Sequence, residues 1–129
     1  MFQKLLQLAA WSAIVTIGVL SLVPAELRPH TGASGYLEHM AAYFITAVLL
    51  SLAYPRCPPA AIISPLVICA AGVEIAQLYI PGRNASIADW IAGSFGLLIG
   101  AVVATFILRL WLRSPDTIEK KAGTDLLGP

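Results

Sequence analysis

A single carboxyl side chain interrupts the apolar stretch at residues 60–83, which reads AAIISPLVICAAGVEIAQLYIPGR. Glu74 stands inside this stretch, Gln77 follows nearly one helical turn later, and Arg83 comes at its end. The stretch is long enough for a helix that spans a bilayer, which needs about 20 apolar residues. A charged side chain at that depth costs roughly 2.5 to 3.5 kcal/mol, so it needs a partner or a function. Glu74 is therefore the first candidate for a functional residue.

The composition of the whole chain is that of a membrane protein. Hydrophobic residues make up 58% of the 129 residues and charged residues 12%, whereas an ordinary soluble domain is about 25% charged. Four apolar stretches approach spanning length, at residues 5–25, 37–54, 60–80 and 87–112. The first exceeds the core of a secretory signal, so we expect it to remain as an uncleaved helix. We predict an all-α fold, a four-helix transmembrane bundle over residues 1–113, followed by a disordered polar cytoplasmic tail at residues 114–129.

The basic residues predict the orientation of this bundle, because Lys and Arg near helix ends are retained on the cytoplasmic side. With both termini in the cytoplasm, most basic residues lie inside, namely Lys4, Arg56, Arg109, Arg113, Lys120 and Lys121. Arg28 and Arg83 then lie outside. The net charge of +1 gives no basic footprint for nucleic acid, so we expect the lipid bilayer and no nucleic acid as partner.

This topology brings polar residues from separate helices together at the outer end. They are His39 and Tyr43 from the second helix, Glu74 and Gln77 from the third, Arg83 from the loop, and Asp89 from the fourth. Glu74 and Gln77 are three residues apart and share a helix face, which must point inward because lipid satisfies neither. We predict that these six residues form a ligand-binding pocket, with Glu74, His39 and Asp89 as candidates for acid or base chemistry. Alternatively, Glu74 and Arg83 form a purely structural ion pair.

The sequence contains no motif for a cofactor, and we predict none. His39, Glu74 and Asp89 are acceptable metal ligands, but their spacing follows no local metal motif, so no metal is predicted either. On the fourth helix, Gly93, Gly96 and Gly100 form a stripe of small residues that allows close helix approach. This stripe packs against a neighbouring helix or mediates a homo-oligomer.

Three sequence blocks resemble the VanZ-like family of small bacterial membrane proteins: SLVP at 21–24, LEHMAAYF at 37–44, and EIAQLYIPGRNASIADWIAGSFGLLIGA at 74–101. The resemblance implies the same six polar positions and a multi-pass protein of the bacterial inner (plasma) membrane. The name-giving member is associated with resistance to the glycopeptide antibiotic teicoplanin. Many relatives carry an Asp–Lys pair where this chain has Gly35 and Tyr36. A mechanism that requires that pair does not transfer to this chain.

Three functions fit these observations. In the one we favour, the outer pocket binds an envelope lipid, a lipid-linked precursor or a glycopeptide-related ligand, with a link to glycopeptide resistance. The second is a membrane-embedded hydrolase or transferase that uses Glu74 or His39 as acid or base, oriented by Asp89. The third is a purely structural interaction protein. The sequence leaves open whether the protein catalyses a reaction.

Overall fold

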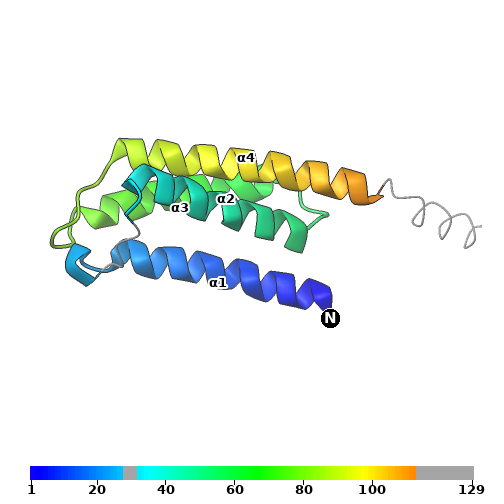
Figure 1. Ribbon diagram of the computed structural model, residues 1–129, viewed down its shortest axis with the longest axis horizontal. Coiled ribbons are helices and arrows are strands. Elements are labelled where there is room, and N and C mark those ends of the chain that lie inside the picture. Colours follow the sequence, from blue (N-terminus) through cyan, green and yellow to red (C-terminus); the bar gives the residue numbers. More distant parts are fainter. Residues whose placement is uncertain (28–31, 113–129) are drawn as a thin grey trace, which may run out of the picture.

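A computed structural model describes residues 1–27 and 32–112 of the protein. It contains four long helices, α1 (Phe2–Leu22), α2 (Gly35–Ala53), α3 (Pro59–Gln77) and α4 (Ile87–Leu112), and one short 3-10 turn at Ala25–Leu27. The four helices run alongside one another (Figure 1), and each is long and apolar enough to cross a membrane. No strand occurs in the described ranges, which confirms the predicted all-α, membrane-spanning fold.

Two predicted helices end earlier in the structure. The first ends at Leu22 rather than at residue 25, because Val23 adopts an extended conformation before Pro24, as residues that precede proline tend to do. The third ends at Gln77 rather than at residue 80, because the chain tightens into successive turns whose hydrogen bonds span three residues, beginning with Leu78 N to Ile75 O at 3.2 Å. The predicted tail at 114–129, together with Arg28 and Arg113, lies outside the described residues.

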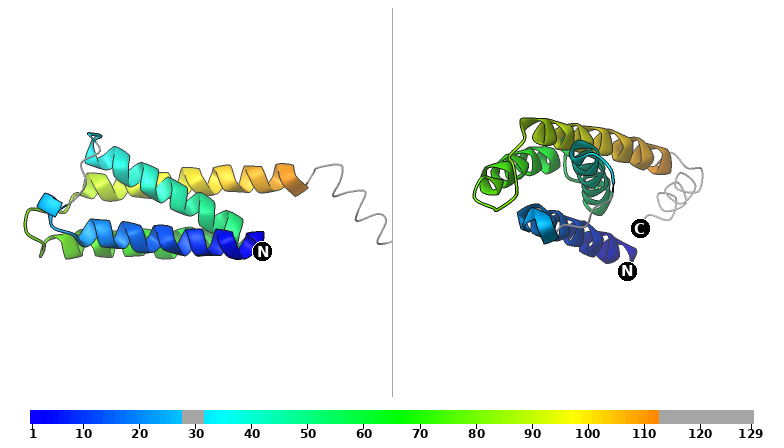
Figure 2. Two further views of the ribbon diagram at one scale, coloured as in Figure 1. Left: turned by 60° about the horizontal axis from the view of Figure 1, so that its bottom comes forward. Right: turned by 60° about the vertical axis from the view of Figure 1, so that its left-hand side comes forward.

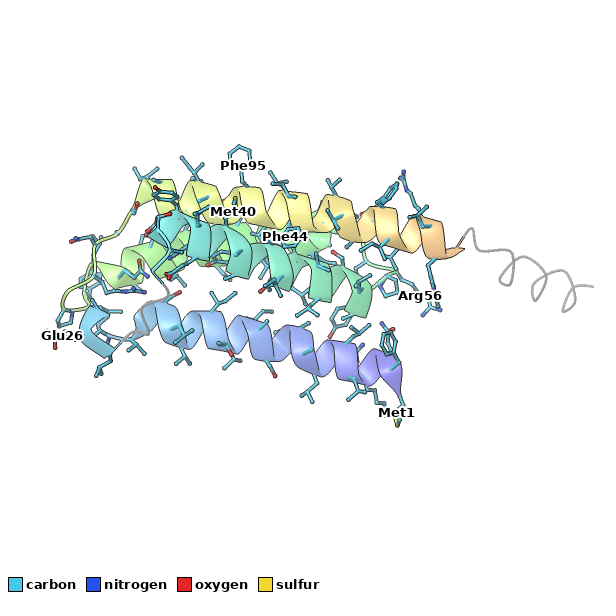
Figure 3. The ribbon with its side chains drawn as sticks, viewed as in Figure 1. Met1, Glu26, Met40, Phe44, Arg56 and Phe95 are labelled. Atoms are coloured by element: carbon cyan, nitrogen blue, oxygen red, sulfur yellow. The ribbon has the colours of Figure 1, made fainter. Side chains whose placement is uncertain are left out.

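Helices α2 and α4 form the closest pair in the bundle. A Cβ atom added at Gly96 would overlap the carbonyl oxygen of Met40, and one at Gly100 would lie 2.5 Å from the carbonyl oxygen of Phe44. These obstacles are backbone atoms, so no change of rotamer removes them. Met40 and Phe44 lie where α2 crosses α4, while Phe95 points away from the bundle (Figure 3). The glycine stripe of α4 therefore packs against α2 of the same chain.

The interior of the bundle is built mainly from small side chains. Its buried apolar residues are Ala10, Tyr43, Ala47, Leu50, Ala53, Ala70, Leu97, Ala101 and Ala104. Small residues let membrane helices approach closely, and van der Waals packing then holds them together. Large apolar side chains such as Phe106 and Trp111 are more than half exposed. Large apolar side chains on the outside and small ones inside are what a surface in contact with lipid requires.

Helix α1 packs against the other helices along its length, with Leu6, Ala10 and Ile14 in one apolar cluster and Ile17 against another. Ala10 and Ser21 are its buried residues, and Figure 1 and the right-hand view of Figure 2 show it at the edge of the bundle. Near the N-terminus, the Gln3 side-chain amide donates to the carbonyl oxygen of Ala53. Halfway along α1, Trp11 Nε1 donates to Tyr54 Oη at 3.0 Å. The contacts at the other end belong to the candidate site.

Candidate functional site

The polar residues predicted from the sequence lie at the end of the bundle where α1 and α3 finish and α2 and α4 begin. We call this the acidic end, because it holds every acidic residue that the structure describes, namely Glu26, Glu38, Glu74 and Asp89. The opposite end, which we call the basic end, holds Lys4, Arg56 and Arg109. Figure 3 shows Glu26 at one extremity and Met1 and Arg56 at the other.

Glu74 is the central polar residue of the acidic end. Its side chain is buried in α3, with 8% of the residue exposed. Oε2 accepts a hydrogen bond from the backbone N–H of Ser86 at 2.8 Å, and Oε1 lies 3.9 Å from His39 Nδ1 on α2. The second distance suits an ion pair and exceeds that of a hydrogen bond. One carboxyl group therefore connects α3, the start of α4 and α2.

Asp89 lies between the beginnings of two helices. Ser86 caps α4 by accepting a hydrogen bond from the backbone N–H of Asp89 at 3.2 Å, a role expected of serine at this position. In a capping box, the acidic residue returns a bond to the N–H of the capping residue, but here Glu74 accepts that bond. The Asp89 carboxyl group instead lies beside Gly35, where a Cβ atom would be 3.6 Å from Oδ2. It is close to the positive dipole ends of α2 and α4, where a negative charge is stabilising.

Gln77 and Arg83 both bind the end of α1. Gln77 Nε2 donates to the carbonyl oxygen of Ser21 at 3.0 Å, and Arg83 Nη2 donates to the same oxygen at 2.7 Å and to that of Leu20 at 3.2 Å. The last carbonyl groups of a helix lack partners within the helix, and a cation there also offsets the negative dipole end. Gln77 is 4% exposed. These two side chains therefore fix the end of α1 to α3 and its loop.

A cavity of about 600 Å³ lies beside these contacts, between α1 and α2. Most of its wall is apolar, with Ile17 and Leu20 from α1 and Leu37 and Met40 from α2 among the lining residues. Polar side chains also line it: Ser21, Glu38, His39, Tyr43 and Arg83. The rings of His39 and Tyr43 are neighbours on α2, with centroids 6.3 Å apart and planes tilted by 44°. The cavity therefore combines an apolar surface with a cation, a carboxyl group and an imidazole.

The six predicted residues thus fall into two groups of three. His39, Tyr43 and Arg83 line the cavity. Glu74, Gln77 and Asp89 lie outside its lining. Glu74 and Gln77 connect helix ends by hydrogen bonds, and the Asp89 carboxyl group lies beside the start of α2. Within the described ranges, no group of three His, Cys, Asp or Glu side chains is close enough to hold a metal ion.

The predicted set of ligand-binding residues left out three contributors to the site. Ser21 supplies the carbonyl oxygen that Gln77 and Arg83 share, and Glu38 adds a carboxyl group to the cavity wall. Ser86 supplies the N–H that Glu74 accepts. Two of these groups belong to the backbone, which every residue carries, so side-chain chemistry gave no signal. Only the positions of these residues gave a signal. Ser21 lies three residues before Pro24, where a helix is expected to end, and Ser86 lies directly before the first turn of α4.

Comparison with known proteins assigns the chain to a family. Among curated proteins and among solved structures, no match was found. A family model described as VanZ/LLP1 matches residues 2–109. The match covers α1, α2 and α3 in full and α4 as far as Arg109, and it extends beyond the blocks that carry the resemblance in the sequence. The protein, a bundle of four apolar helices with a polar site at one end, therefore belongs to the VanZ/LLP1 family.

Proposed function

We propose that the cavity between α1 and α2 binds an amphiphilic lipid of the bacterial envelope, either a polar membrane lipid or a lipid-linked precursor. The observation that carries this proposal is the combination of a long apolar wall with polar side chains in one cavity of about 600 Å³. Ligand pockets commonly measure about 300 to 1,000 Å³ and are mostly apolar, with few polar groups that fix orientation. A lipid matches this cavity, because it has an apolar chain for the apolar wall and a polar headgroup for the polar side chains.

The polar lining residues suit a phosphate-containing headgroup. Arg83 carries a guanidinium group, which forms strong charge-assisted hydrogen bonds to phosphate oxygens. His39 adds a second donor, and Glu38 accepts hydrogen bonds from hydroxyl or amino groups of the headgroup. In this proposal Gln77 does not contact the ligand, because its amide is buried against Ser21.

Glu74, Gln77 and Asp89 keep the cavity in shape. Gln77 bonds the end of α1 and Glu74 bonds the residue before α4, while Asp89 lies beside the start of α2, so the positions of α1, α2 and α4 around the cavity depend on these side chains. A ligand then meets side chains that are already placed, which reduces the entropy lost on binding.

The cellular setting follows from the predicted orientation. With both termini in the cytoplasm, the acidic end lies at the outer face of a bacterial inner membrane, in contact with the lipids on which envelope synthesis depends. We propose a role in glycopeptide resistance through such a lipid, in keeping with the resemblance to the name-giving member.

One observation supports a second candidate function, that of a hydrolase or transferase. His39 Nδ1 lies 3.9 Å from Glu74 Oε1, and His39 also lines the cavity. A histidine oriented by a carboxylate is an arrangement used in general acid and base catalysis. In that case Glu74→Gln would abolish turnover in a protein that remains folded, whereas in the binding case the affinity would fall only in part.

The test is to identify the lipids that co-purify with the protein. Mass spectrometry would compare the wild type with His39→Ala and Arg83→Ala, and with Lys4→Ala as a matched control that removes a charge from the basic end. We expect one lipid species to be retained by the wild type and the control and depleted in both cavity variants. Melting curves in detergent would show that the variants remain folded. The same lipid profile in all four proteins would refute the proposal.

A further inference from the structure

A second concave site lies toward the basic end, between α3 and α4. This crevice has a volume of about 290 Å³ and is lined by Pro59, Ile63, Leu98, Ala101, Val102, Thr105, Phe106 and Arg109. The Thr105 hydroxyl donates to the carbonyl oxygen of Ala101 at 2.7 Å, so its proton is used within α4. Apart from Arg109, the wall therefore offers an apolar surface, which suits a hydrocarbon chain.

One lining residue of the crevice, Arg109, is basic, and a second arginine, Arg56, precedes the helix that begins with the lining residue Pro59. Arg109 is exposed and lies on the same face of α4 as Thr105 and Val102, at spacings of four and seven residues. Arg56 is also exposed, in the turn three residues before Pro59, the first residue of α3. Throughout residues 1–27 and 32–112, every carboxyl side chain belongs to the acidic end. No described carboxyl group therefore neutralises these two arginines.

We infer that this crevice binds an anionic phospholipid, with one acyl chain in the crevice and the phosphate held by Arg109 and Arg56. Arginine side chains near the ends of membrane helices extend toward the headgroup region, and a guanidinium group binds phosphate with two parallel hydrogen bonds. Charge complementarity selects an anionic lipid over a zwitterionic one, because basic residues near a membrane surface attract anionic lipids. The site is separate from the cavity at the acidic end and does not depend on the function proposed for it.

Native mass spectrometry of the purified full-length protein tests this inference, with dioleoyl phosphatidylglycerol as the anionic probe and dioleoyl phosphatidylcholine as the zwitterionic one. We expect Arg109→Ala and Arg56→Ala each to weaken phosphatidylglycerol binding about fivefold. Lys4→Ala is the matched control, because it removes the same charge from the same end but on α1, away from the crevice. It should leave the affinity unchanged, and all variants should bind phosphatidylcholine equally weakly.

Val102→Phe provides an independent test that leaves the charge unchanged. Val102 is 69% exposed, so a larger side chain fits without disturbing the core, yet it fills part of the crevice. We expect this variant to lose phosphatidylglycerol binding as well, with an unchanged melting curve. Equal losses in Lys4→Ala and Arg109→Ala would show a general effect of charge and overturn the inference. Full binding by Val102→Phe would show that the crevice holds no chain.

Discussion

The Glu74 carboxyl group accepts a hydrogen bond from the backbone N–H of Ser86 at 2.8 Å, across the loop that joins α3 to α4. In doing so it takes the position that Asp89 would occupy in an ordinary capping box. Asp89 is thereby available to lie beside Gly35 at the start of α2. A carboxyl group inside an apolar helix thus has a structural task, while its second oxygen faces His39 in the cavity wall.

Removing Glu74 should destabilise the bundle more than neutralising it. Glu74→Ala leaves the Ser86 N–H without its partner, and an unsatisfied buried group costs about 1 to 3 kcal/mol. Glu74→Gln retains an oxygen that accepts this bond, so its loss of stability should be clearly smaller. Unfolding titrations in mixed micelles would measure both free energies. Equal losses in the two variants would contradict the assignment of the Ser86 bond as the main structural role.

The close packing of α2 on α4 should be sensitive to a single methyl group. Gly96→Ala places a Cβ atom against the Met40 carbonyl oxygen, and overpacking of this kind costs about 1 to 3 kcal/mol. Gly72→Ala is the matched control, because nothing lies within 4 Å of a Cβ atom at that position in α3. The control should keep or raise the melting temperature. A control that loses as much stability as Gly96→Ala would argue against the close α2–α4 contact.

Each end of α1 should loosen independently. Gln77→Ala removes a bond to the Ser21 carbonyl oxygen, so amide hydrogen exchange should accelerate at the end of α1, around residues 17–23. Gln3→Ala removes the contact with Ala53 and should accelerate exchange near the start of α1 instead. Exchange in α4 should not change in either variant. If each substitution accelerated exchange along the whole helix, α1 would open as a single unit and its two ends would not open separately.

The orientation of the bundle is open to a direct labelling experiment. Cys57 is exposed in the turn between α2 and α3, which the positive-inside rule places in the cytoplasm. A membrane-impermeant thiol reagent should therefore leave it unlabelled in intact cells and label it in lysed ones. In a protein without its native cysteines, Asn84→Cys in the α3–α4 loop should already be labelled in intact cells. Labelling of Cys57 in intact cells would show that the bundle has the opposite orientation.

The sequence was sufficient to predict the four membrane-spanning helices and the gathering of polar residues at one end. Both follow from simple constraints: spanning helices need about 20 apolar residues, and short loops bring alternate helix ends together. Which polar residues line the cavity and which connect helix ends was not predictable in the same way. Whether Gln77 contacts a ligand or the Ser21 carbonyl oxygen depends on how far α3 rotates and where α1 ends, and neither is encoded in local spacing.

The partner of the glycine stripe was likewise open from the sequence. Small residues at helical spacing indicate close packing without naming the neighbour, and the structure shows that α2 is the neighbour of Gly96 and Gly100. A homo-oligomer stays a prediction, and it would have to use another surface of α4.

Photo-crosslinking within a membrane tests the proposed lipid site most directly. A photoreactive amino acid would replace Leu37, which lines the cavity and is 49% exposed, or Ile91, which is 44% exposed on α4 and lies outside the cavity lining. Mass spectrometry would identify the lipid attached at each position. Our account predicts one enriched lipid species at position 37 and the bulk composition of the membrane at position 91. Bulk composition at both positions would contradict it.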